Sequence, residues 1–422
     1  MHDKRAISGT VAILIVIVAV IIIGGVYWYV TRPPPVTEVK IGAVYPLTGP
    51  IAPHGKTIKD TIDWYFEGIN AAGGIKSLGG IPVKLIWADS EGDPKVGASE
   101  IERLITTEKV HMLIGCYQSA VTITAAEVAQ RYKIPMHIYA GSDPILQQGY
   151  DYVFRSHSSV AMFARPPVVF YRDAGIKNVA IINENTMFGH TTGTAYEKYC
   201  EDFGIDVVLH EEYDAKAVDF TPLVTKLKAA NPEAILACGY LADSVKIITT
   251  IKEQGLNVKA IAGAEGGHGM VDFVELLGDD AEYVMVGVTC PMDVKLPETI
   301  DFFSRYRAKF GKDPDTIAGM AVQQAETVYH VLEAAGSLDP EDLREAFYKI
   351  DFVSSIGRVK FQKEEVEFGL GPMLNQNPYA MAGLQQVQNG KHITVAVYPA
   401  DVYSPDIVPG RPIFPMPPWE ER

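Results

Sequence analysis

The chain has 422 residues, of which 47% are hydrophobic and 21% are charged, and its formal net charge is −15. This length exceeds what one hydrophobic core normally covers, so the sequence predicts two domains, and the composition excludes an intrinsically disordered chain. The negative charge excludes a general nucleic-acid-binding protein, because such proteins present a basic surface to the phosphates.

An uncharged apolar segment, residues 6–30, lies near the N-terminus. A helix of this length, at about 1.5 Å per residue, exceeds the roughly 30 Å hydrocarbon thickness of a bilayer. Lys4 and Arg5 precede it, and residues 27–29 (Tyr-Trp-Tyr) lie where an aromatic belt belongs. We predict that residues 1–35 form a transmembrane anchor in the cytoplasmic membrane and a proline-rich spacer, and that the remaining chain is extracytoplasmic, at the cell surface or in the periplasm. A buried core helix is the alternative.

The chain after the spacer opens with a strand, a helix and a second strand. Residues 39–45 form the first expected strand, and a Gly/Pro loop follows it. Ile58, Ile62 and Phe66 then share one face of an expected helix, and residues 83–88 form the second strand. This unit predicts a parallel sheet whose strand-to-helix loops lie at one edge, where open α/β sheets bind ligands.

Strands and helices keep alternating, and the pattern restarts after about residue 158. Residues 113–121 resemble residues 236–245, and residues 139–143 resemble residues 261–265. We therefore expect an α/β fold of two doubly wound parallel-sheet lobes of like topology that face a shared cleft, with chance similarity of the loops as the alternative. The expected later elements are helices at 297–310, 314–336 and 340–349, a strand at 358–361 and an antiparallel pair at 381–388 and 392–397.

Motifs of catalysis and of metal binding are missing from the sequence. There is no HExxH, GxSxG or CxxC motif, and the four cysteines are far apart, so they suggest either disulfides or buried thiols rather than a zinc site. The segment 49–57 approaches a phosphate-binding loop, but five residues separate its glycines where four are needed. We therefore expect no enzyme activity, no cofactor and no metal.

Three residues in the expected strand-end loops suit an amino acid. Ser119 opens a helix just after a strand, and its hydroxyl and the first free N–H groups suit a carboxylate. Ser142 adds a hydroxyl from the neighbouring loop, and Glu265, in a Gly-rich loop of the second half, suits an ammonium group. The alternatives are that Ser119 is a helix cap and that Glu265 is a solvated loop residue.

From residue 39 to about residue 399 the chain resembles the substrate-binding proteins of branched-chain amino acid ABC transporters, the leucine/isoleucine/valine-binding family with the type I periplasmic binding fold. The segments that carry this resemblance are IGAVYPLTGPIAPHG, INAAGGI with GGIPVKLIWADSEGDP, LIGCYQSAVT, IPMHIYAGSDP, FGHTTG and IAGAEGG. The resemblance implies that Ser119 and the step Ala140, Gly141 and Ser142 bind the carboxylate and ammonium of the ligand. It also implies that Glu265 binds the ammonium.

The resemblance further implies an aromatic wall around the ligand. Phe188 would cover the ligand, and Tyr240 or its neighbour Leu241 would form another side of the site. The chain departs from the family pattern in three ways: His54 stands where branched-chain binders often have Trp, Tyr117 is bulkier than the usual residue, and Gly92 and Gln118 occupy the places of a disulfide that some members form. Glu265 favours an amino acid, whereas these departures leave an aromatic acid or a short amide as the alternative ligand.

The same fold implies two lobes joined by three crossings near residues 157, 288 and 354. Lobe 1 would comprise residues 36–157 and 289–353, and lobe 2 residues 158–288 and 354–422. Closure of the lobes around the ligand would deliver it to an ABC permease with its ATPase, the partner that the family implies. The alternatives are the sensing domain of a receptor and a periplasmic enzyme. No set of catalytic residues in the sequence supports the enzyme.

Overall fold

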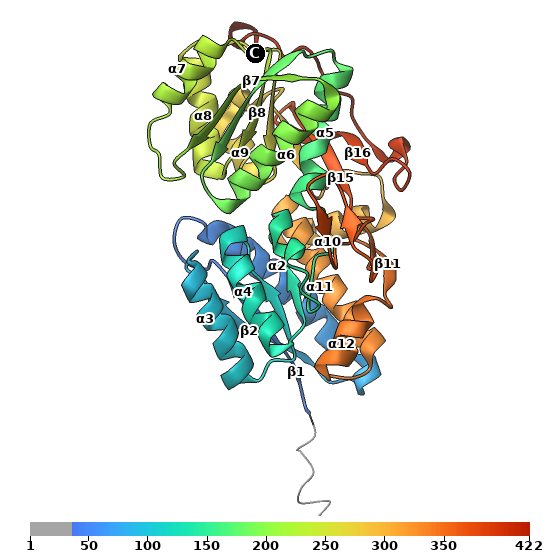
Figure 1. Ribbon diagram of the computed structural model, residues 1–422. Coiled ribbons are helices and arrows are strands. Elements are labelled where there is room, and N and C mark those ends of the chain that lie inside the picture. The colour runs from blue at the N-terminus through green and yellow to red at the C-terminus, as the bar shows by residue number, and fades with distance from the viewer. Residues whose placement is uncertain (1–35) are drawn as a thin grey trace, which may run out of the picture. The chain divides into compact units, whose positions relative to one another are not determined.

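The computed structural model describes residues 36–422. The expected membrane anchor, residues 6–30 within the segment 1–35, therefore lies outside the described residues. Within residues 36–422, no helix is both long enough and apolar enough to cross a membrane. Residues 39–422 form one unit, in which two sheets are each covered by helices (Figure 1).

The first sheet is parallel throughout and has the strand order β2-β1-β3-β4-β5. Its strands are β1 (Val39–Tyr45), β2 (Val83–Asp89), β3 (Met112–Gly115), β4 (Met136–Ile138) and β5 (Val153–Phe154). The helices of this lobe are α2 (Ala52–Ala71), α3 (Pro94–Arg103), α4 (Ser119–Tyr132), α10 (Pro297–Phe310), α11 (Thr316–Ala335) and α12 (Pro340–Phe347). The expected opening unit is thereby confirmed, with Ile58, Ile62 and Phe66 of α2 buried against the sheet.

The second sheet has seven strands in the order β16-β15-β10-β9-β8-β6-β7. The parallel strands are β6 (Asn178–Glu184), β7 (Asp206–Tyr213), β8 (Ala234–Cys238), β9 (Ala260–Ala264) and β10 (Met285–Val288), and the expected antiparallel pair is β15 (Ala382–Gln388) and β16 (Lys391–Tyr398). The helices are α5 (Val160–Asp173), α6 (Met187–Phe203), α7 (Thr221–Ala230), α8 (Leu241–Glu253) and α9 (Val271–Leu277). Each sheet carries one apolar core on each of its faces.

The remaining elements are short. Two strand pairs, β11 (Asp351–Ser354) with β12 (Gly357–Lys360) and β13 (Val366–Glu367) with β14 (Pro372–Met373), follow α12. Short 3₁₀ helices lie at Lys76–Leu78, Asp143–Gln148, Gly278–Ala281, Pro405–Ile407 and Trp419–Glu421, and a π-helical turn lies at Leu104–Glu108.

The third crossing between the lobes differs from the expected position near residue 354. Val359 and Phe361 pack in the core that contains β1, and Val366 and Met373 pack in the core that contains α4. Residues 354–373 therefore belong with the first sheet, and the chain enters the second sheet only with β15.

The first and third crossings are hydrogen-bonded to each other. The N–H of Arg155 donates to the carbonyl of Asn375 at 3.1 Å, and the N–H of Asn377 donates to the carbonyl of Arg155 at 3.0 Å. The side chain of Gln376 donates to the carbonyl of His157 at 2.8 Å. The connection between the sheets is therefore a bonded pair of segments rather than independent loops.

Candidate ligand-binding site

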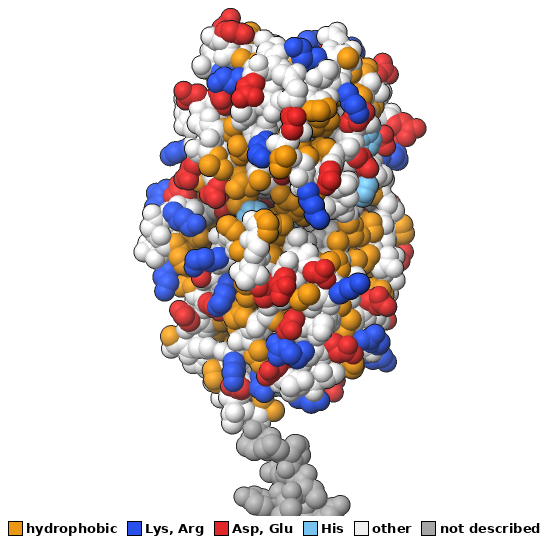
Figure 2. Space-filling view, turned by 90° about the vertical axis from the view of Figure 1, so that its left-hand side faces the viewer, with side chains coloured by type: hydrophobic (Ala, Val, Ile, Leu, Met, Phe, Trp, Pro, Cys, Tyr) orange, Lys and Arg blue, Asp and Glu red, His pale blue; other side chains and the backbone are white. Residues whose placement is uncertain are grey.

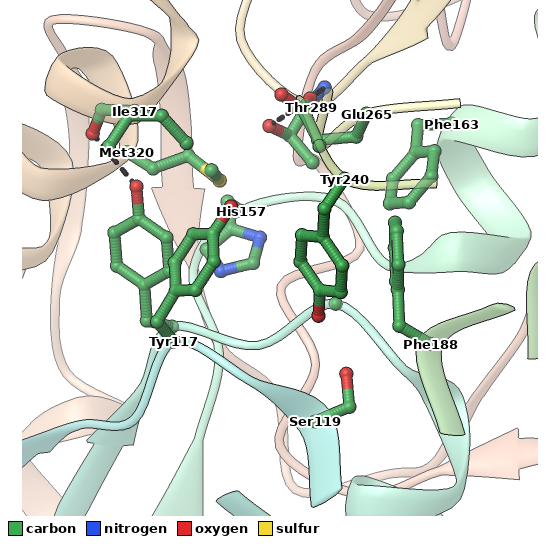
Figure 3. A pocket seen from close by; sticks show the side chains of 13 residues that line it. Tyr117, Ser119, His157, Phe163, Phe188, Tyr240, Glu265, Thr289, Ile317 and Met320 are labelled. Atoms are coloured by element: carbon green, nitrogen blue, oxygen red, sulfur yellow. Dashed lines mark hydrogen bonds between the residues drawn. The ribbon is translucent and has the colours of Figure 1, made fainter. Parts of the chain in front are cut away.

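A small cavity lies where the strand ends of the two sheets face each other (Figure 3). Its volume is about 40 Å³. One water molecule needs roughly 10–15 Å³ on this scale, so the cavity has room for a few waters and must widen to admit an amino acid. Its lining comes from the loops after β3, β4, β8, β9 and β10, from the first crossing, and from α4, α5, α6 and α11.

Ser119 lies at one end of this cavity, as the first residue of α4. Gln118 is the N-cap residue, so the interpretation of Ser119 as the cap is wrong. The hydroxyl of Ser142 donates a hydrogen bond to the hydroxyl of Ser119 at 2.8 Å. The first N–H groups of a helix lack intrahelical acceptors and carry a partial positive charge, so this end of the cavity suits an anion.

Glu265 lies at another side of the cavity and is only 5% exposed, so its interpretation as a solvated loop residue is wrong. One carboxylate oxygen accepts from the N–H of Thr289 and, at 2.7 Å, from the Thr289 hydroxyl. The other accepts from the hydroxyl of Thr316 at 2.6 Å. A carboxylate has about four acceptor positions, so one is left for a further donor. Burial raises the pKa of Glu265, and the hydrogen bonds from Thr289 and Thr316 oppose that rise.

Aromatic rings close the space between the lobes. The rings of Tyr117, after β3, and Tyr240, after β8, have centroids 6.3 Å apart. Phe188 lies 5.7 Å from Tyr240 on the second-sheet side, and Tyr139 lies 5.6 Å from Tyr117 on the first-sheet side. Figure 3 shows the ring of Tyr240 between Ser119 and Glu265. The polar groups are thus held in a site with apolar walls.

Six of the nine predicted site residues line the cavity: Tyr117, Ser119, Gly141, Phe188, Tyr240 and Glu265. Ala140, Ser142 and His54 lie directly behind this lining. His54 is buried, with its ring 5.1 Å from that of Tyr117, and burial lowers its pKa to about 4. Its role is therefore to support the ring of Tyr117 rather than to face the cavity.

A buried guanidinium fixes the loop that follows β4. Arg155 donates to the carbonyls of Ala140 at 3.0 Å and Ser142 at 3.1 Å, and to the side chain of Gln376 at 2.6 Å. Burial lowers the pKa of Arg155 to about 10, and the nearby Asp143 opposes that change. Arg155 therefore positions Ser142 and, through Ser142, the hydroxyl of Ser119.

Several lining residues were not predicted from the sequence, among them Tyr139, His157, Thr289 and Met320. Tyr139 and Thr289 follow strand ends, so the rule that located Ser119 could have found them. Met320 lies on α11, which no motif connects with the site. In the part of the chain that the structure describes, no group of three or more His, Cys, Asp or Glu side chains is placed to bind a metal, and the four cysteines are free and buried.

Comparisons with known proteins agree with this geometry. A family model described as "Periplasmic binding protein" matches residues 38–372. "Leu/Ile/Val-binding protein homolog 7" of Brucella abortus is 26% identical over 383 residues, which cover 86% of this chain and 92% of the relative.

Two solved structures show the same fold. A leucine-binding protein from Thermotoga maritima gives a TM-score of 0.76 at 23% identity and covers 86% of this chain and 99% of its own. A solute-binding protein of an ABC transporter from R. palustris, in complex with benzoate, gives a TM-score of 0.76 at 20% identity and covers 85% of this chain and 96% of its own. The expected α/β fold of two parallel-sheet lobes is thereby confirmed.

Proposed function

This chain belongs to the periplasmic binding protein family, whose members bind solutes and are not enzymes, and we propose that it is an extracytoplasmic solute-binding protein that captures an amino acid between its lobes. The observation that carries this proposal is the placement of Ser119 and Glu265 in one cavity (Figure 3). A hydroxyl at a helix N-terminus suits a carboxylate, and a buried carboxylate with one free acceptor position suits an ammonium.

Each of the predicted site residues has a place in this proposal. Gly141 and Ser119 contact the ligand carboxylate, and Glu265 contacts the ammonium. Phe188 and Tyr240 cover the ligand from the second-sheet side, and Tyr117 covers it from the first. Ala140, Ser142 and His54 support these residues from behind, through the contacts described above.

Binding would proceed by hinge closure between an open and a closed form. The contact between Tyr117 and Tyr240 joins the two lobes and leaves a cavity of about 40 Å³, so the arrangement described here is a closed one. A ligand must separate these rings to enter, and it then shifts the equilibrium toward closure by its contacts with both lobes. An ABC permease with its ATPase would recognise the closed form and receive the ligand.

The relatives favour two ligand classes. The name of the Brucella abortus relative and the Thermotoga maritima leucine-binding protein favour a branched-chain or other apolar amino acid. The R. palustris protein, with benzoate, makes an aromatic acid the second candidate. The aromatic lining of the cavity supports that second candidate, whereas the placement of Glu265 supports the first, because an aromatic acid has no ammonium group.

The proposal includes anchoring of the protein in the cytoplasmic membrane by residues 6–30. This uncharged segment is long enough to cross a bilayer, and Lys4 and Arg5 before it favour a cytoplasmic N-terminus. The alternative function, the sensing domain of a receptor, would use the same cavity and closure but would require a signalling partner instead of a permease.

Calorimetric titration of the full chain, purified in detergent, against the common amino acids and benzoate tests the proposal. We expect Glu265→Gln to lower the affinity for an amino acid at least tenfold and to leave the affinity for benzoate unchanged. Glu253→Gln, the same change at an exposed site on α8, is the matched control. Equal affinities of the Glu265 variant and the unchanged protein would remove the ammonium role, and an absence of binding to all probes would refute the function.

A further inference from the structure

His157 lines the cavity but has no role in the proposed function. It belongs to the first crossing between the lobes, is 2% exposed, and its ring lies 6.0 Å from that of Tyr139. In the view of Figure 3 its imidazole lies on the Tyr117 side of Tyr240, off the line that joins Ser119 and Glu265. A ligand whose carboxylate and ammonium meet those two residues would therefore direct its side chain toward His157.

The contacts of His157 define which ring nitrogen carries the proton. Nδ1 lies 2.9 Å from the carbonyl oxygen of Ser158. A carbonyl can only accept, so Nδ1 is the donor in this hydrogen bond. Burial and the nearby charge of Arg155 lower the pKa of His157 to about 4, and the carbonyls of Ser158 and Tyr139 oppose this only in part. At neutral pH the ring is therefore uncharged, and Nε2 carries a lone pair.

This Nε2 atom is distinctive among the polar groups of the cavity. Several buried side-chain polar atoms within residues 36–422 lack a hydrogen-bond partner. Among the described residues that line the cavity, only His157 has such an atom, and the atom is Nε2. Glu265 already accepts hydrogen bonds from Thr289 and Thr316, and Ser119 accepts one from Ser142. A buried acceptor without a donor costs free energy, which a donor on the ligand would recover.

We propose that His157 determines specificity at the proposed amino-acid site by accepting a hydrogen bond at Nε2 from a neutral donor, a hydroxyl or an amide, on the ligand side chain. Ile317 and Met320 of α11 also line the cavity and provide the apolar surface beside this donor. The nearby buried guanidinium of Arg155 disfavours a cationic side chain. This inference rests on the proposed function, and it makes the preferred ligand one with a polar group at the end of an otherwise apolar side chain.

Matched pairs of probes that differ by one donor test the inference. The pairs are L-tyrosine with L-phenylalanine, L-threonine with L-valine, L-asparagine with L-leucine, and 4-hydroxybenzoate with benzoate, each titrated into the full chain in detergent. We expect the donor-bearing member of at least one pair to bind at least tenfold more tightly, because a site built around a polar contact rejects the analogue that lacks it. The member without the donor supplies the baseline for the other contacts.

Three variants assign the preference to His157. His157→Phe keeps a ring but removes Nε2. We expect it to reduce the preference for the donor-bearing ligand to less than threefold, while the ligand of the pair that lacks the donor binds with unchanged affinity. His157→Gln keeps an acceptor near the same place, and we expect it to retain part of the preference. His137→Phe is the matched control, since His137 is also a buried histidine without side-chain partners but lies outside the cavity lining, 6.2 Å from the ring of Phe347.

The outcomes separate the two proposals. Binding of amino acids without any preference for a donor overturns the role of His157 and leaves the function intact. An equal loss of affinity for both ligands of a pair in His157→Phe also overturns the specificity role of His157, because the residue then has a structural role. If no probe binds to the unchanged protein, the proposed function itself fails, and the specificity role fails with it.

Discussion

The hydroxyl of Ser142 donates a hydrogen bond to the hydroxyl of Ser119 at 2.8 Å, so the Ser119 oxygen accepts and its own proton is available to a different acceptor. Ser142 is fully buried, and Ser119 lines the cavity. The pair thus directs one O–H donor from the start of α4 toward the site where we place the ligand carboxylate.

We predict that Ser119→Ala lowers the affinity for the ligand by about tenfold or more, because a hydrogen bond to a charged group contributes about 1.5–3 kcal/mol. Ser142→Ala should have a smaller effect, since it only frees the orientation of Ser119. Ser304→Ala, at an exposed site on α10, should change nothing. Titration calorimetry measures all three, and a larger effect of Ser142→Ala than of Ser119→Ala would reverse the assigned roles.

Tyr240→Ala should favour the open form of the ligand-free protein. The ring of Tyr240 lies 6.3 Å from that of Tyr117 in the other lobe, and such a pair contributes about 0.5–1.5 kcal/mol. We expect a larger radius of gyration by small-angle scattering, which a bound ligand reverses. Tyr329→Ala removes a ring 6.5 Å from that of Tyr65, with both rings in lobe 1, and should leave the radius unchanged. Equal radii for the two variants would contradict the closure contact.

Arg155→Met should destabilise the protein by about 3–5 kcal/mol, because it removes a buried cation from near Asp143 and leaves the carbonyls of Ala140 and Ser142 without their donor. Urea unfolding measures this change. Arg305→Met, at an exposed site on α10, is the control and should cost less than about 1 kcal/mol. A stability equal to that of the control would show that Arg155 is not a structural centre of the crossing.

His268 gives a pH-dependent contribution to stability. Its side chain is 1% exposed, and burial, together with the smaller effect of the nearby His392, lowers its pKa to about 3. The native state therefore binds a proton less readily than the unfolded state, and the stability that His268 contributes is present above pH 6.5 and declines as pH falls toward 3.

The variant His268→Phe should lose this contribution and the part of the pH dependence that comes from His268. As the pH falls from 6.5 to 4, the unchanged protein loses the contribution of His268 and the variant does not. The free energy of unfolding of the variant minus that of the unchanged protein should therefore increase by about 3 kcal/mol over this range, at about 1.4 kcal/mol per pH unit. Urea unfolding of both proteins at several pH values measures this difference. Parallel pH profiles would show that His268 titrates alike in the folded and unfolded chains.

The surface seen in Figure 2 carries Lys and Arg side chains interspersed with Asp and Glu. The strands and helices around β1 and β2 could be predicted because apolar spacing within a short window determines them. The carboxyl edges of the strands then located Ser119 and Glu265 without reference to any contact, whereas Gly141 was implied only by the family resemblance.

Other features depend on contacts between distant segments and have no local signal. Glu265 receives its hydrogen bonds from Thr289 and Thr316, which are 24 and 51 residues further along the chain. Met320 enters the cavity because α11 returns to the first sheet, and the two-residue strands β13 and β14 are too short for a periodic pattern. The third crossing differs from expectation for the same reason, since burial of Phe361 against the first sheet is visible only in three dimensions.

The hydrogen bonds between the segment around Arg155 and the segment around Gln376 restrict how the lobes can separate. A twist in either segment alone would break bonds to the other, so dihedral changes must concentrate at the ends of this bonded pair. In the hinge closure that we propose, the movement would then be a rotation about an axis along the pair. Ligand capture would then alter a single mechanical coordinate, and a permease could distinguish loaded from empty protein by one angle.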